Sequence, residues 1–339
     1  MGKEKLITKH GHNMFEISSM IQKALRRADS ESAYYAANEM LASYRGYLWK
    51  RLLCVSAEDC YDMVTSPIVG LMKKDEQRTN PLDSSNVSKA VSILLKARKN
   101  RDADYFACNL LNSRDKRSLR PYIEDEKLTT QCPSKNGHDM FDLAAHLGKA
   151  IDCNDSVAVG YSANELYQRY RSFLWDTLVG KVIQLGFSRL TAEVYALRKV
   201  DDEQQSSKNV STIYVSKAIV LILKVAKYRS VGIYDETPVP DEFDLSRMDN
   251  AFKVIPDYVF DCHTYLGKVR GKTKRDFVVT EQRSLRPYIQ GEYDLLSWDR
   301  YFQLSEIGFY DANNLTPRPA KEVLKELNGG SLQLNLFGE

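Results

Sequence analysis

The stretch GHNMFEISSMIQKAL…SYRGYLW (residues 11–49) occurs a second time as GHDMFDLAAHLGKAI…RYRSFLW (residues 137–175). Aligned without a gap, the two stretches are identical at 16 of 39 positions. Shorter matches follow in the same order: SKAVSILLK (88–96) with SKAIVLILK (216–224), and SLRPYI at both 118–123 and 284–289. A pattern that recurs in order over most of the chain predicts a tandem duplication of one domain. The identical pairs include Gly11/Gly137, His12/His138, Phe15/Phe141, Tyr35/Tyr161, Asn38/Asn164, Glu39/Glu165, Arg45/Arg171 and Trp49/Trp175.

Apolar residues at helical spacing predict helices throughout both copies. In the first copy we expect helices over 14–28, from about 34 to 41, from about 47 to 55, after Ser84/Ser85, and around 105–111. SLRPYI should be extended, because the residue before a proline is pushed away from the helical region. The second copy repeats this order up to a helix over 215–225, after which about 40 residues are inserted. Few segments read as strands, so the sequence predicts an all-α fold.

The repeats divide the chain into five parts. A lead-in (1–10) precedes the first helical repeat (11–130) and the second (131–290), which carries the insertion at about 230–280. A C-terminal helical extension (291–327) and a tail (328–339) follow. Each repeat is long enough to bury a core of its own.

Composition excludes several classes of protein. The chain is 43% apolar and 27% charged, with a formal net charge of +3, so its overall charge does not demand a polyanionic partner. Its six cysteines contain no C-x-x-C pair and resemble reduced thiols rather than a disulfide framework or a zinc site. The polar, basic N-terminus resembles no signal peptide, and no apolar run is long enough for a membrane span. We expect a cytoplasmic protein without cofactor or metal.

The tail carries the sharpest motif. Gln333, Leu334, Asn335, Leu336 and Phe337 follow a Gly-Gly pair and resemble the bacterial sliding-clamp-binding peptide. Such a peptide needs two large apolar anchors for a pocket and a glutamine amide that fixes its register by hydrogen bonds. The alternative is that the alternating leucines form a strand docked on the protein's own surface.

The duplicated region also resembles a known module. AYYAANEML…YLWKRLLCVSAEDC (33–60) and NVSKAVSILLKA (86–97) are similar to the C-terminal helical part of the RarA/MgsA family of replication-associated AAA+ ATPases. The resemblance implies a collar-like oligomerisation module, with Glu58-Asp59 as the family's acidic step. The second copy departs from it, because Gln184-Leu185 stand in those places. It alone carries DYVFDCHTYLGKVRGKTKRDF (257–277), which is similar to a segment of shorter relatives.

The ATPase part of that family is not found in the sequence. GKVRGKT (267–273) is not a phosphate-binding loop, since only three residues separate its glycines where four are needed. The same segment is the densest basic run, with Lys268, Arg270, Lys272, Lys274 and Arg275. These cations could bind nucleic-acid phosphates, or they could lie on an ordinary solvated loop.

The other candidate residues have mainly structural interpretations. His12 and His138 precede the first helix of each repeat, where we expect a capping or backbone-bonding role. Glu39/Glu165 with Arg45/Arg171 are expected to form ion pairs or helix-packing contacts within each repeat. Trp49 and Trp175 are expected to anchor the core. His263, beside Asp261, is the one candidate general base.

Three hypotheses follow. The first is a non-enzymatic DNA replication or repair accessory protein that binds the bacterial β sliding clamp through its tail, as recruiter or inhibitor. Its body would contact DNA, a clamp loader or a polymerase, and a module without its motor would suit a phage or mobile element. The second is a self-associating helical scaffold, because two fused copies can replace a dimer of single modules. The third is an enzyme that acts through Asp261, His263 and the basic loop.

Overall fold

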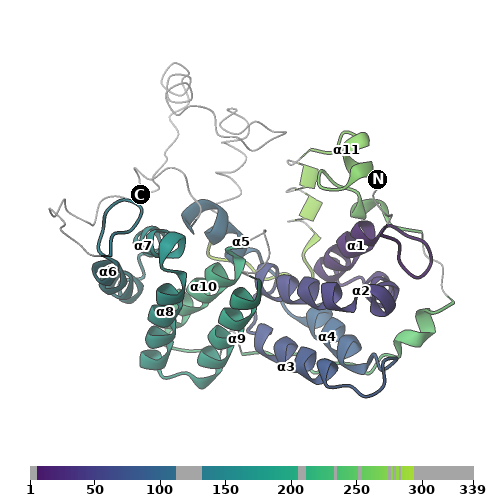
Figure 1. Cartoon of the computed structure of the whole chain (residues 1–339), viewed down its shortest axis with the longest axis horizontal. Helices are drawn as coiled ribbons and strands as arrows, with labels where there is room; N and C mark the ends of the chain where they lie inside the picture. The colour runs from purple at the N-terminus through teal and green to yellow at the C-terminus, as the bar shows by residue number, and fades with distance from the viewer. Residues whose placement is uncertain are drawn as a thin grey trace.

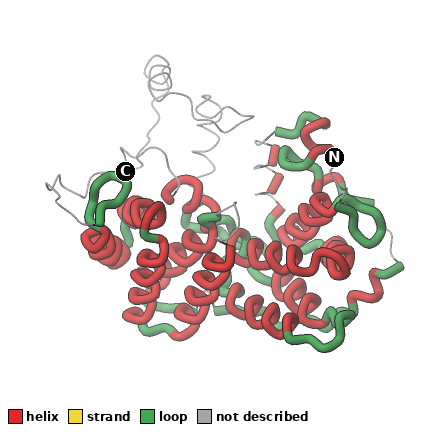
Figure 2. Tube along the Cα trace, viewed as in Figure 1, coloured by secondary structure: helices red, strands yellow, loops and turns green. Residues whose placement is uncertain are grey.

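A computed structural model describes residues 6–111, 132–204, 211–232, 235–250, 254–273, 276–277, 280–281 and 284–293. Over these ranges the chain is all-α, as the sequence predicts (Figure 2). They contain isolated β-bridges but no strand. None of the helices in these ranges combines the length and the apolar character needed to cross a bilayer.

The helices of the two repeats lie side by side (Figure 1). The first repeat contributes α1 (Met14–Arg27), α2 (Ser30–Glu58), α3 (Thr65–Glu76), α4 (Ser85–Lys96), α5 (Asp102–Tyr105) and the π-helical turn η1 (Phe106–Leu111). The second contributes α6 (Met140–Asp152), α7 (Ser156–Arg169), α8 (Arg171–Leu185), α9 (Ser188–Gln204) and α10 (Ile213–Tyr228). The short helices η2 (Leu245–Met248), η3 (Asp257–Val259) and α11 (Tyr265–Val269) follow.

The second and third helices expected in the first repeat are joined into α2, with a bend at Tyr44 (φ −131°, ψ 28°). The equivalent Tyr170 (φ −125°, ψ 45°) separates α7 from α8. Both tyrosine hydroxyls donate to a backbone carbonyl of the segment before their repeat's first helix, that of Ile7 or Pro133, at 3.0 Å. The bend therefore recurs together with the contact that holds it.

Each repeat builds the same anchor in its core. The Asp75 carboxylate accepts two hydrogen bonds from Arg45, at 2.7 and 2.8 Å, and one from the indole nitrogen of Trp49 at 2.8 Å. In the second repeat Asp201, Arg171 and Trp175 make the same set of contacts. Both indoles are buried, which confirms them as core anchors.

At the repeat-equivalent positions, the structure overturns one of the two alternatives that the sequence left open for each pair of residues. His12 and His138 do not cap the first helix, because Asn13 and Asp139 do so. Their rings instead contact the hydroxyls of repeat-equivalent tyrosines, at 2.8 and 2.7 Å. The conserved Glu–Arg pair of each repeat does not form either, since the arginines bind the aspartates described above.

Glu39 and Glu165 have another role. Each is fully buried on the second helix of its repeat and accepts hydrogen bonds from the segment that precedes the first helix. A buried carboxylate needs such donors to offset the loss of hydration. The donors lie before the repeated stretch, at Thr8 and His10 and at Ser134 and Asn136, so the stretch itself did not reveal them.

The repeats exchange the segments that follow their last long helix. Residues 241–249, which follow α10, lie on the first repeat, where Phe243 stacks on Tyr34 at 3.9 Å and Asp249 accepts a bond from Asn38. Conversely, η1 follows α4 but packs on α7, where Leu111 accepts a bond from Asn164. The repeat-equivalent asparagines thus hold each other's trailing segments.

A second set of contacts joins the repeats at α3 and α9, which pack against each other. The buried Glu193 of α9 accepts hydrogen bonds from the backbone nitrogens of Thr65 and Ser66, at 2.9 and 2.7 Å. It therefore caps the first turn of α3 from the other repeat. Lys217 of α10 also donates to the carbonyl of Tyr61 at 3.1 Å. The two repeats share one continuous core.

Candidate functional site

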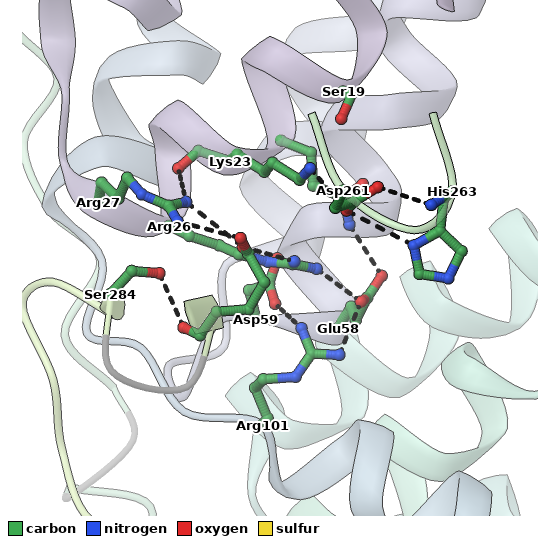
Figure 3. A network of polar contacts seen from close by, with 12 residues as sticks. Ser19, Lys23, Arg26, Arg27, Glu58, Asp59, Arg101, Asp261, His263 and Ser284 are labelled. Carbon is green, nitrogen blue, oxygen red and sulfur yellow. Dashed lines mark hydrogen bonds and ion pairs between the residues drawn. The ribbon is translucent and has the colours of Figure 1, made fainter. Parts of the chain in front are cut away.

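The strongest sequence motif, Gln333–Phe337, lies outside the described residues, as do Lys274 and Arg275 of the basic run. The clusters that remain surround the acidic step of α2 and the insertion of the second repeat (Figure 3).

Glu58 and Asp59 lie between two arginines (Figure 3). Arg26 of α1 binds Glu58 at 2.7 Å and Asp59 at 2.8 Å. Arg101, just before α5, binds the same two carboxylates at 3.0 and 2.8 Å. Arg26 also reaches Glu281 at 3.0 Å, which ties the end of the insertion to the first repeat. The acidic step is therefore the centre of a buried ion-pair network that joins four segments.

Three carboxylates, those of Glu58, Asp59 and Glu281, face the two arginines in a largely buried site. Burial alone would raise the pKa of Glu58, but Arg26 and Arg101 outweigh it and lower that pKa, whereas burial raises the pKa of Asp59. The three carboxylates around Arg26 raise the pKa of its guanidinium against the opposing effect of burial. Such a network fixes the relative positions of its segments more than it adds stability, because its acidic and basic groups all lose hydration when they are buried.

The missing acidic step of the second repeat has a physical explanation. Asp152 stands there in the place of Arg26, so carboxylates at 184 and 185 would face a third acid. Gln184 and Leu185 avoid this repulsion, and Asp152 pairs with Lys181 at 2.6 Å instead. The two repeats thus differ together at positions that contact one another in the first repeat.

A second polar cluster lies where the insertion meets α1. Lys23 binds Asp261 at 2.6 Å and donates to the carbonyl of Val259 at 2.7 Å. The ring nitrogen Nδ1 of His263 lies 3.5 Å from Asp261 and 3.5 Å from the sulfur of Cys262. Sequence reasoning overlooked this thiol as a neighbour of the histidine.

The charge state of His263 argues against its use as a base. Hydrogen bonding to Asp261, with a contribution from Cys262, raises the pKa of His263 to about 9. The raised pKa favours the protonated imidazole, paired with Asp261, over the neutral form that a general base needs. The aspartate's own pKa is held well below its usual range, against the effect of burial, by this imidazole and by Lys23. The cluster fits a salt bridge that fastens the insertion to α1.

The described part of the basic run is not uniformly available. Arg270 pairs with Asp257 at 2.6 Å and lies over the ring of Phe260. Lys272 lies 3.9 Å from the same carboxylate, and Lys268 forms no ion pair with any residue in the described ranges. Arg270 and Lys272 therefore share one carboxylate, and only Lys268 of these three cations has no acidic partner in the described ranges.

A cavity of about 310 Å³ lies where α2 and α3 meet the end of α9. Trp49, Leu53, Met72 and Val200 contribute apolar walls. The Nε atom of Arg78, also in the wall, is buried without a hydrogen-bond partner. Acidic and basic groups are mixed around the rest of the cavity, so its charge favours neither a cationic nor an anionic ligand.

Comparisons with family models, curated proteins and solved structures found no match to this chain. The RarA-like module is therefore carried by the sequence resemblance alone and remains a proposal. The described geometry adds the partners of the acidic step, which no local sequence pattern revealed because Arg101 and Glu281 lie far from it in the chain.

Proposed function

We propose that this protein is a non-enzymatic accessory factor of DNA replication or repair that binds the bacterial β sliding clamp through Gln333–Phe337. The observation that carries the proposal is the peptide Gln-Leu-Asn-Leu-Phe after Gly329-Gly330. Its glutamine amide and its adjacent leucine and phenylalanine are the groups that such an apolar pocket recognises. The resemblance of both repeats to the RarA/MgsA collar module supports a place beside the replication machinery.

In this proposal the body is a rigid carrier and the tail is its tether. The buried network around Glu58 and Asp59 supports rigidity, since it ties α1, α2, α5 and the insertion together. A tethered body acts as a recruiter if it binds a further replication factor. It acts as an inhibitor if it only occupies the clamp pocket.

Clamp binding is tested with the purified full-length protein on an immobilised bacterial β clamp. We expect micromolar or tighter binding that is lost in a Leu336→Ala, Phe337→Ala double variant. Leu332→Ala, just before the motif, is the matched control and should bind like wild type. Equal binding by the double variant, or no binding by the intact chain, would refute the proposal.

A second candidate function, a self-associating scaffold, is favoured by the exchange of trailing segments between the repeats. The pairs Asn38–Asp249 and Asn164–Leu111 show how one repeat completes the other. The same exchange between chains would build an oligomer. Light scattering over a hundredfold concentration range tests this, and a constant monomer mass would reject it.

A further inference from the structure

The helix α11 and its two ends form a compact, fixed structure on the insertion. The Thr264 hydroxyl caps the first turn by accepting a hydrogen bond from the Gly267 nitrogen at 3.1 Å. At the other end, the nitrogens of Gly271 and Lys272 donate to the carbonyls of Lys268 and Gly267, both at 3.0 Å. This pair of bonds, with Gly271 at φ +70°, is a Schellman motif. Both ends of the helix are therefore held in place.

One face of α11 is held against the body. Gly267 lies so close to the Asp261 backbone that any added Cβ would overlap it. Asp261 is itself fixed by Lys23 of α1, and Val259 accepts bonds from both Lys23 and Ser19. The light-green segment around α11 accordingly lies beside α1 in Figure 1. Because this face of α11 is packed against the body, the residues on its opposite face point to solvent.

The outward face carries an aromatic ring between cations. Tyr265, Lys268 and Val269 share this face, because residues three and four apart lie on one side of a helix. Tyr265 is 77% exposed and Val269 is 67% exposed. Lys272 follows directly, held by the bond that ends the helix. The protonated imidazole of His263 adds a further positive charge at the start of this segment.

Among the described residues, four cations (Lys23, Lys268, Arg270 and Lys272) outnumber the three acids of this segment. Asp257 pairs with Arg270 and lies 3.9 Å from Lys272, and Asp261 pairs with Lys23. Asp276 accepts hydrogen bonds from the Thr273 hydroxyl and backbone nitrogen, both at 2.8 Å, and keeps its negative charge. The exposed ring of Tyr265 is accessible for stacking on a ligand. A ring flanked by lysines is what proteins use to stack on an unpaired base and bind its phosphates.

We propose that α11 and the turn after it bind single-stranded DNA, with Tyr265 stacked on a base and Lys268 and Lys272 on the neighbouring phosphates. Unpaired bases are required because a duplex hides its base faces from a protruding ring. The choice of DNA rests on the proposed function, which places the protein at a clamp that encircles DNA. This surface differs from the sequence-based set: Arg270 is the nearer partner of Asp257, Lys274 and Arg275 lie outside the described residues, and Tyr265 is added.

The test is fluorescence anisotropy of a labelled oligo-dT of about 20 nucleotides with the full-length protein in 50 mM salt. Tyr265→Ala should weaken binding by about fivefold to 150-fold, the range for one stacked base. Lys268→Gln with Lys272→Gln should lower the slope of log affinity against log salt by about 1.4, since each phosphate contact contributes about 0.7 on single strands. Lys73→Gln with Lys74→Gln on α3, the same charge change elsewhere, should have no effect.

Three results would overturn the inference: no binding of oligo-dT in 50 mM salt, unchanged binding by Tyr265→Ala, or equal binding of a duplex of the same length. Tyr265 is exposed, so its replacement should leave the circular dichroism spectrum unchanged. The chain truncated after Asn328 should still bind oligo-dT, and Tyr265→Ala should still bind the clamp. These two arms separate failure of this inference from failure of the proposed function.

Discussion

Arg26→Met should be among the most destabilising single substitutions in the chain. Arg26 is 1% exposed, and its guanidinium neutralises part of a site that holds Glu58, Asp59 and Glu281. Without it, Glu58 and Asp59 must share Arg101, and one buried negative charge is left uncompensated. Breaking a buried ion pair from one side costs about 3–5 kcal/mol. That is a fifth or more of the total stability of a typical domain, about 5–15 kcal/mol.

The measurement is a urea titration followed by tryptophan fluorescence at pH 7. The midpoint should fall with an unchanged m-value, because the loss lies in the native state. The matched control is Lys96→Met, which breaks an exposed pair with Asp241 and should cost less than about 1 kcal/mol. The deficit of Arg26→Met should shrink as the pH is lowered, because the uncompensated carboxylate can then take up a proton. A loss below about 1 kcal/mol at pH 7 would refute the account of this network.

Three further predictions concern the insertion and the repeats. The imidazole of His263 should titrate near pH 9 by NMR, and Asp261→Asn should move its pKa toward the ordinary 6.5. Because the pKa is raised in the folded state, the stability that His263 contributes is complete below about pH 6.5 and is lost as the pH rises through 9. A titration midpoint near 6.5 in the wild type would contradict this prediction. Asp201→Asn should lower the free energy of unfolding in urea by about 2 kcal/mol, because it weakens the charged hydrogen bonds from Arg171 and Trp175. An unchanged free energy of unfolding would count against the anchor that both repeats share. Gly291→Ala should destabilise the chain, because the added Cβ would overlap the buried carboxylate of Asp102 on α5. The control Gly46→Ala, which has open space and a helical backbone, should stabilise the chain by about 0.5–1 kcal/mol, and similar thermal midpoints for the two variants would show the overlap to be harmless.

The sequence predicted the helical class and most helices because their apolar spacing is local information. It missed α3 and α9. The α3 segment has Pro67 near its start and lies between the helix expected to about residue 55 and the one expected after Ser84/Ser85. The α9 segment is rich in charges, so its apolar side is less evident. In both cases packing against the other repeat stabilises a helix that the local apolar pattern does not indicate.

The site was harder to predict because its partners are distant in the chain. Glu58-Asp59 was recognised as a pattern, but Arg26, Arg101 and Glu281 come from three other segments. Charge along the sequence also did not show that Arg270 pairs with Asp257 within the basic run. Internal comparison was more informative: most residues identical in both repeats that the structure describes make the same contact twice.

The binding isotherm of the full-length protein on a bacterial β clamp, measured beside a chain that ends at Asn328, tests the central proposal most directly. The proposal predicts micromolar or tighter binding by the full-length protein and none by the shortened one. Equal binding by both would place the clamp contact on the helical body. No binding by either would remove the clamp from the account and leave the scaffold as the leading function.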